Sequence, residues 1–306
     1  MKKLSILSRM TTTTAGALLI WCVGAMPTLA QECGDDEPFG ECRVLVEINS
    51  TDGDIGFHWL TDGDDLNSTR IDDPNGVKVF HNRGFGPLRE QKLTETFGES
   101  AEPLCWDDGD VDPDEIVTLE DFRDTWEPGT YQVTGKSGGE TVFGEAELTY
   151  YLPAAPTALW FDVNTGVISW ESGDDLGNCT PEAPDSLKQL VADEVLDAMP
   201  EDVPVLAWEV VLEPDVDDSD PRAGLVFSTR VAGPLAAVAA GTPYSVTVPS
   251  DYLAALGDDT PVKIEVGAIG GDFEIDGEGE VDGDDDNATF TEAGDFCVNE
   301  DEGCDD

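Results

Sequence analysis

The 306-residue sequence predicts a mainly β protein of two β-sandwich domains with short helices inserted. Three observations lead to this fold class. Apolar and polar residues alternate in short runs such as residues 43–48, as in strands that bury one face. Turn sequences such as Asp73-Pro74-Asn75-Gly76 separate these runs. Apolar residues make up 40% of the chain, which favours packed cores over disorder despite the many acids.

The first domain is expected at residues 44–152, after a lead-in at residues 31–43 that is bracketed by two cysteines. Strands are predicted at residues 43–48, 56–60, 77–80, 129–134, 140–143 and 146–152. Helical spacing of apolar residues predicts short helices at residues 87–97 and 118–126. Pro153 and Pro156 belong to a short, stiff break in this pattern, and we place the domain boundary there.

The second domain is expected at residues 153–290. Its strands are predicted at residues 158–161, 167–170, 205–212, 225–230, 244–248, 262–269 and 288–290. A helical insertion at about residues 185–199 is stopped by Pro200. Residues 291–306 are expected to form an acidic tail that contains cysteine.

The second domain also contains a recognisable residue pattern. It consists of Pro156, Leu159, Phe161, Asp162, Thr165, Gly166, Ile168 and Trp170, followed by Trp208-Glu209-Val210. This pattern resembles the opening strands of a fibronectin type III domain, in which the second strand buries a Trp. The resemblance implies a sandwich and an adhesive or spacer role, and it transfers no active site.

Two departures from the fibronectin pattern stand in this sequence. The corner Tyr of the family would fall at Val262, so its hydrogen bond is absent at that position. About 35 residues that include the helical insertion separate the strands of Trp170 and Trp208, which are closer in the family. The first domain resembles immunoglobulin-like sandwiches more loosely, through the sequence EPGTYQV at residues 127–133.

Acidic residues dominate the composition, with 67 Asp and Glu against 15 Lys and Arg and a formal net charge of −52. Nucleic acid is excluded as a partner, because its binding depends on clusters of Lys and Arg that neutralise phosphates. Cations are expected to bind instead. A chain that repels itself so strongly is stabilised by salt, since the Debye length falls to about 3 Å at 1 M. The composition therefore predicts a protein adapted to salt.

Residues 1–30 predict export from the cell. Lys2 and Lys3, a short apolar core and small residues before Gln31 are typical of a signal peptide that is cleaved after Ala30. No later run is apolar over the roughly 18 residues that a membrane span requires. We therefore expect a secreted or surface-associated protein, with the periplasm as the alternative location.

Six cysteines follow the predicted signal peptide, and an even number in an exported chain favours disulfides. The short spacings indicate the pairs Cys33–Cys42 and Cys297–Cys304, which leaves Cys105 to pair with Cys179. This set is one of the 15 connectivities that six cysteines allow.

The best candidate for a binding site is the acidic sequence DDGDVDPD at residues 107–114. Calcium takes six to eight oxygen ligands, which alternate carboxylates on a tight loop supply. The expected ligands, at positions 1, 3, 5 and 12 of such a loop, are Asp110, Asp112, Asp114 and Asp121. The match is incomplete, because Glu115 stands where the sharp turn requires Gly. The alternative is an acidic surface loop that caps the following helix.

Other patterns carry less chemistry. Paired carboxylates, which glycoside hydrolases use, arise by chance in a chain this acidic. His58 and His81 are expected to be half-buried strand residues, and a metal site shared by the two is the alternative. The Trp side chains are expected to pack in the cores, with Trp106 the least buried, and a sugar-stacking platform is the alternative.

These observations predict a non-catalytic extracellular module that acts in adhesion, interaction or structure. Its expected partner is an extracellular protein or polysaccharide. A calcium- or carbohydrate-binding module is the first alternative. A secreted hydrolase that uses an acidic pair is the second.

Overall fold

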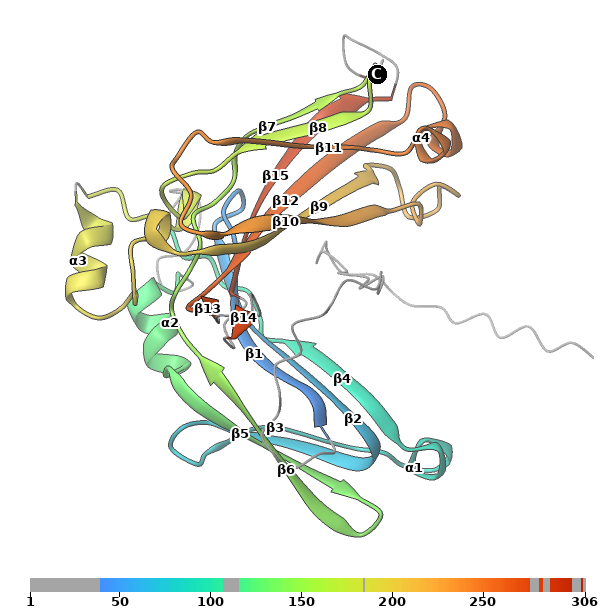
Figure 1. Cartoon of the computed structure of the whole chain (residues 1–306). Coiled ribbons are helices and arrows are strands. Elements are labelled where there is room, and N and C mark those ends of the chain that lie inside the picture. The colour runs from blue at the N-terminus through green and yellow to red at the C-terminus, as the bar shows by residue number, and fades with distance from the viewer. Residues whose placement is uncertain are drawn as a thin grey trace, which may run out of the picture.

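The computed structural model describes residues 39–106, 116–183, 185–275, 281–282, 287–298 and 304. Strands dominate these residues and the helices are short, so the predicted mainly β fold class is confirmed (Figure 1). The predicted signal peptide at residues 1–30 lies outside the described residues. No helix among the described residues is long and apolar enough to cross a membrane.

One sheet of ten strands runs through both halves of the chain. Its main path is β10 (Phe227–Ala236), β9 (Val205–Pro214), β12 (Pro261–Gly270), β15 (Asn287–Cys297), β1 (Phe39–Asn49), β2 (Asp54–Asp72), β5 (Gly129–Ser137) and β6 (Glu140–Leu148). Neighbouring strands on this path are antiparallel, except that β1 and β15 are parallel. Two further strands, β3 (Lys78–Arg83) and β4 (Leu93–Glu99), pair with the long strand β2.

The second half of the chain forms a sandwich of two sheets. A three-stranded sheet of β11 (Pro243–Thr247), β8 (Val167–Glu171) and β7 (Thr157–Asp162) lies against the end of the large sheet (Figure 1). Trp170 from one sheet meets Trp208 from the other, with ring centroids 6.0 Å apart and both side chains fully buried. The fibronectin-like pattern predicts that Trp170 is buried, and the structure agrees. A helix, α4 (Ser250–Leu256), packs Leu256 into the same core.

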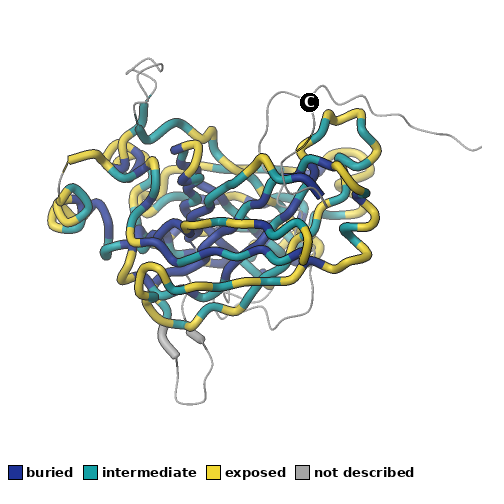
Figure 2. The backbone as a smooth tube through the Cα atoms, turned by 90° about the horizontal axis from the view of Figure 1, so that it is seen from above, coloured by how far each residue is buried: buried dark blue, intermediate teal, exposed yellow. Residues whose placement is uncertain are grey.

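In the first half, the first strands, β5, β6 and helix α2 (Leu119–Thr125) form one core. Leu190 and Leu196, from the insertion in the second half, also belong to this core. Phe57 stacks on Trp126 with ring centroids 4.0 Å apart. Tyr131 is fully buried, and its hydroxyl donates a hydrogen bond to the carbonyl of Glu127 at 3.1 Å. This bond, four residues back along the chain, is the corner bond that many sandwiches make. Figure 2 shows that the buried residues concentrate along the central strands of the molecule.

Several predicted elements differ from the observed ones in their bounds. The helix predicted at residues 87–97 is wrong in its second half, because α1 covers only Pro87–Gln91 and β4 follows it. The chain leaves the helix at Lys92, whose φ is 74°, and Thr94 and Thr96 then favour a strand. The insertion contains only the short helix α3 (Ser186–Ala192). The two remaining strands, β13 (Glu274–Ile275) and β14 (Val281–Asp282), pair with each other.

The two halves are joined by more than the chain that links them. Asn287, at the start of β15, is 2% exposed, and its side-chain oxygen accepts a hydrogen bond from the backbone N–H of Val46 at 2.8 Å. Its Nδ2 donates to the carbonyls of Thr149 and Tyr151, each at 3.1 Å. One side chain thus binds β15, β1 and the segment after β6 to one another.

Two of the three predicted disulfides are confirmed, namely Cys105–Cys179 and Cys297–Cys304. Cys42 is fully buried and disulfide-bonded. Cys33 lies outside the described residues, so the pair Cys33–Cys42 stays a prediction. Disulfides form and persist in oxidising compartments, which agrees with the predicted export.

Candidate anion-binding site

Most of the predicted calcium ligands cannot be placed. Asp110, Asp112 and Asp114 lie outside the described residues. Asp121 lies in the first turn of α2, where its backbone N–H donates to the hydroxyl of Thr118 at 3.2 Å. Its carboxylate accepts a hydrogen bond from the same hydroxyl at 3.1 Å. Thr118 therefore caps the helix and Asp121 accepts a hydrogen bond from its hydroxyl, while calcium binding and the alternative of a capping acidic loop both stay predictions.

The most distinctive polar feature of the described residues is a hollow lined by bases. Its charged residues are Arg83 at the end of β3, Arg89 and Glu90 in α1, Lys92 after that helix, and Lys136 in β5. The remaining lining residues are Asn67, Gly86, Gly138 and Gly139. We call this feature the basic hollow. In Figure 1, α1 and the tip of the β5–β6 hairpin lie at the same end of the first half.

The bases of the hollow differ from most other bases of the protein in their pairing. Twelve Lys and Arg follow the predicted signal peptide, and seven of them lie in ion pairs with Asp or Glu. Within the part of the chain that the structure describes, none of the four bases of the hollow makes an ion pair. On a chain with 67 acids, this leaves four positive charges together and uncompensated by contact.

Local structure accounts for how these bases come together. Lys92 ends α1 in a left-handed backbone conformation, and its ammonium donates to the side-chain oxygen of Asn67 in β2 at 2.8 Å. The β5–β6 hairpin turns at Gly138 and Gly139, which have φ of 56° and 96°, values that glycine adopts without strain. This tight turn keeps Lys136 close to the edge of the hollow, where its ammonium donates to Thr141 of β6.

Apolar side chains stand exposed beside the bases. Phe85 is 72% exposed, and the guanidinium of Arg83 lies 5.6 Å from the centroid of its ring. Leu88 in α1 is 49% exposed. Guanidinium groups bind carboxylate and sulfate oxygens through paired hydrogen bonds, and aromatic rings pack on the apolar faces of sugars. An exposed aromatic ring and a guanidinium group without an ion pair among the described residues thus lie side by side at the edge of the basic hollow.

The strongly negative net charge of the chain gives no indication of the basic hollow, although a local excess of bases is present in the sequence. Residues 78–92 contain four of the twelve bases and a single acid, Glu90. An average over the chain removes this contrast. Lys136 is 44 positions beyond Lys92, and only the pairing of β5 with β2 brings it to the hollow.

The other predicted candidates are not among the residues that line the hollow. His58 is opposite Leu45 and Glu99 in the sheet, whereas His81 is opposite Arg70 and is exposed, so the two histidines are not neighbours. Trp160 was expected in the core, and this expectation is wrong because its side chain is 60% exposed. Its ring contacts that of Phe296, with centroids 5.6 Å apart. It occupies the outer face of β7, since the neighbouring Phe161 points into the core.

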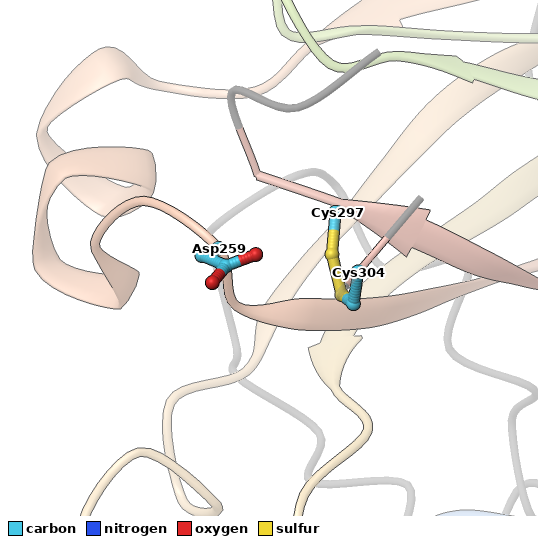
Figure 3. Close-up of side chains that lie close together, drawn as sticks. All are labelled: Asp259, Cys297 and Cys304. Atoms are coloured by element: carbon cyan, nitrogen blue, oxygen red, sulfur yellow. A yellow bond between two sulfur atoms is a disulfide. The ribbon is translucent and has the colours of Figure 1, made fainter. Parts of the chain in front are cut away.

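A second group of potential metal ligands is explained by its bonding. Asp259 lies beside Cys297 and Cys304, as Figure 3 shows. Both sulfurs belong to one disulfide and offer no thiolate. The backbone N–H of Asp259 donates to the carbonyl of Val298 at 2.9 Å, which fixes the loop next to the bridge. The arrangement is structural.

Comparison with known proteins does not assign a family. No protein-family model matches the chain, and no curated protein sequence matches it. Among solved structures, the BSP domain of a biofilm associated protein aligns at 11% identity and a TM-score of 0.21, over 82% of this chain and 29% of that one. A chimeric titin Z1Z2-Z1Z2 tandem aligns at 11% identity and a TM-score of 0.19, over 84% of this chain and 97% of that one. Similarity this low leaves the chain without a family.

Proposed function

We propose that the protein is an exported, non-catalytic interaction module that binds an anionic extracellular polysaccharide in the basic hollow. The observation that carries the proposal is the distribution of charge. Four bases without an ion pair among the described residues line one hollow of a chain that carries 67 acids. Elsewhere the surface charge repels an anionic polymer, so the polymer binds where this repulsion is locally reversed.

The build of the rest of the molecule agrees with such a role. One sheet passes through both halves, Asn287 ties them together, and two disulfides close loops of the chain. A module of this kind presents its binding surface on a rigid support, which lowers the entropy lost on binding. The dense negative surface keeps the protein soluble and dispersed in salt.

The proposal is tested by measuring binding of the full mature chain to immobilised polymers in 0.5 M NaCl. Alginate supplies carboxylates, dextran sulfate supplies sulfates, and uncharged dextran is the reference polymer. We expect binding to at least one of the two anionic polymers and none to dextran. Equal binding to all three would contradict a charge-dependent site, and release of new reducing ends from either polymer would contradict a non-catalytic role.

Variants locate the site. Arg83→Gln combined with Arg89→Gln removes two exposed bases of the hollow, and we expect at least a tenfold loss of affinity. Lys188→Gln is the matched control, because Lys188 is an exposed base in α3 that already pairs with Asp185 at 2.8 Å. Equal affinities of the double variant and the control would exclude the hollow as the binding site.

A calcium site in the segment at residues 107–115 is a second candidate function. One observation favours it: the backbone N–H of Val117 donates to the carbonyl of Leu104 at 2.8 Å, so the two ends of the segment are held together. Cys105 is fixed in addition by its disulfide to Cys179. A closed base of this kind reduces the entropy that a loop loses when its carboxylates gather around an ion. Its test, with Asp110 and Asp112, is given in the Discussion.

A further inference from the structure

Three side chains of types that commonly bind metal ions lie close together on one face of the large sheet. They are Glu47 in β1, His58 in β2 and Glu102, which follows β4. One potential ligand atom from each lies within 4.8 Å of the other two. The Nε2 atom of His58 is 3.4 Å from Oε1 of Glu102, and its Nδ1 atom is 3.9 Å from Oε2 of Glu47.

One nitrogen of the His58 imidazole, Nε2, is buried without a hydrogen bond of good geometry. The residue is only 3% exposed. Within the described part of the chain its Nε2 makes no hydrogen bond, although it faces the carboxylate of Glu102. Buried polar atoms are almost always paired, so an unpaired Nε2 beside the carboxylate of Glu102 indicates that a further atom belongs between the two.

The backbone leaves room at this point. Gly56 lies next to the ring, and a Cβ atom at this residue would be 2.8 Å from Nε2 of His58 and 3.2 Å from Oε1 of Glu102. Any side chain other than hydrogen would fill the space into which these two ligand atoms point. Glycine at position 56 therefore keeps the approach between His58 and Glu102 open.

The local charge is unbalanced in the direction that a cation corrects. The pKa of Glu47 is raised to about 7, mainly by burial. His58 opposes the rise, and the carboxylates of Glu102, Glu209 and Glu99 add to it. Burial and Glu102 likewise raise the pKa of the nearby Asp54 to about 7. A divalent ion would stabilise the charged forms of these groups.

We propose that Glu47, His58 and Glu102 bind one first-row divalent transition-metal ion, for which Zn²⁺ is the reference. One imidazole nitrogen and two carboxylate oxygens form a ligand set of the kind that holds Zn²⁺, with water completing the shell. Metal–ligand bonds of about 2.1 Å in a tetrahedron place the ligand atoms about 3.4 Å apart. The separation of Nε2 of His58 and Oε1 of Glu102 has this value. A carboxylate oxygen of Glu47 completes the group, in which one potential ligand atom of each residue lies within 4.8 Å of the other two. The site is independent of the basic hollow and of the function proposed for it.

The experiment must separate this site from the diffuse attraction of cations to an acidic surface. Zn²⁺ binding is therefore measured by calorimetry on the full mature chain in 1 M NaCl, where surface charges are strongly screened. We expect one ion per chain. Co²⁺ in place of Zn²⁺ should give visible absorption bands whose intensity reports a four-coordinate site, in contrast to the weak bands of hydrated Co²⁺. The absence of a stoichiometric site in the wild-type chain would overturn the proposal, and would assign the cluster to a protonated His58 that bridges two carboxylates.

Three variants make the assignment to residues. We expect His58→Gln to lower the affinity for Zn²⁺ at least tenfold and to abolish the Co²⁺ bands. Because His58 is buried, its loss could also unfold the protein, and Glu102→Gln therefore provides a second variant on a more exposed side chain. His81→Gln is the control, since His81 is exposed and lies on β3. Equal Zn²⁺ affinity in Glu102→Gln, His81→Gln and the wild type would overturn the assignment.

Discussion

Glu265 in β12 lies directly opposite Glu292 in β15, and the negative charge of Glu292 acts on the carboxyl group of Glu265. Two carboxylates on directly opposite residues of neighbouring strands repel each other unless one of them keeps its proton. Burial is the main reason why the pKa of Glu265 rises well above its usual range, and Glu292 and Glu47 add to the effect. The ammonium group of Lys263, 3.8 Å from the carboxylate of Glu292, acts in the opposite direction and lowers the pKa of Glu265. The acidic composition thus reaches partly buried positions of the sheet that joins the two halves.

This pair predicts that the protein loses stability as the pH rises. An unfolded Glu releases its proton near pH 4.3, whereas Glu265 in the folded protein retains it to higher pH. Between these two values the folded state binds more protons, so rising pH favours unfolding. Glu47 and Asp54, each with a pKa of about 7, act in the same direction. Urea unfolding with EDTA present should show the stability fall between about pH 4 and pH 7.

Replacing the carboxyl group of Glu265 isolates its contribution to the pH dependence of stability from those of Glu47 and Asp54. Glu265→Gln keeps the shape and a hydrogen-bond donor, and we expect it to raise the free energy of unfolding at pH 8 by about 1–2 kcal/mol. The fall in stability with pH should also become shallower. Glu140→Gln is the control, because Glu140 is exposed at the start of β6. A variant that matches this control at pH 8 would show that Glu265 carries no such penalty.

Asn287 provides a second prediction, for the junction between the halves. Asn287→Ala removes the acceptor of the buried N–H of Val46 and the donor to the carbonyls of Thr149 and Tyr151. We expect a loss of about 2–4 kcal/mol in the free energy of unfolding, since unsatisfied buried groups cost about 1–3 kcal/mol each. Urea unfolding followed by fluorescence measures it. Asn75→Ala, which removes an exposed hydrogen bond to Glu127, is the control and should cost less than about 1 kcal/mol.

The second sandwich was predictable because local pattern and packing agree there. The alternation of residues 167–170 and 205–212 places Trp170 and Trp208 on the inner faces of their strands, and the structure buries both. The corner bond of Tyr131 follows in the same way from a short local sequence. Alternation with a period of two is a property of each strand by itself, so the sequence displays it directly.

The sheet that joins the halves was not predictable on the same basis. Strand β1 pairs with β15, and the residues paired there, such as Glu47 and Ala288, are 241 positions apart. The alternation in β1 shows that Glu47 lies on the face of the strand opposite Val46 and Ile48. That His58 and Glu102 lie beside it follows only from the register of β1, β2 and β4. The basic hollow was not predicted for a related reason, since Lys136 lies near the other bases only because β5 pairs with β2.

The two described disulfides give a third prediction, because they close loops of very different length. Cys105 and Cys179 are 74 residues apart, whereas Cys297 and Cys304 are 7 apart. A cross-link that closes a longer loop removes more entropy from the unfolded chain. We expect Cys105→Ser with Cys179→Ser to lower the free energy of unfolding by about 3–4 kcal/mol. Cys297→Ser with Cys304→Ser should cost about 2 kcal/mol, and urea unfolding compares them. The reverse order would show that the bridges act mainly through the folded state.

The last prediction separates the general effect of salt from specific binding of calcium. With a net charge of −52, the folded chain repels itself. Raising NaCl from 0.1 M to 1 M shortens the Debye length from about 10 Å to about 3 Å. We expect the melting temperature to rise by about 5 °C or more over this range, because weaker repulsion stabilises the compact state. Replacing the sodium by potassium should change little, since screening depends on charge.

Calcium is then added at millimolar concentration to protein that is already in 1 M NaCl. If Asp110 and Asp112 are ligands, calcium should raise the melting temperature further, because an ion that binds only the folded state stabilises it by mass action. Asp110→Asn with Asp112→Asn should abolish that additional rise and leave the response to NaCl intact. Asp217→Asn with Asp218→Asn removes the same charge from the loop between β9 and β10 and serves as the control. Equal calcium responses in the two double variants would reduce the acidic segment to a part of the charged surface, because a diffuse ion atmosphere does not depend on which two carboxylates are removed.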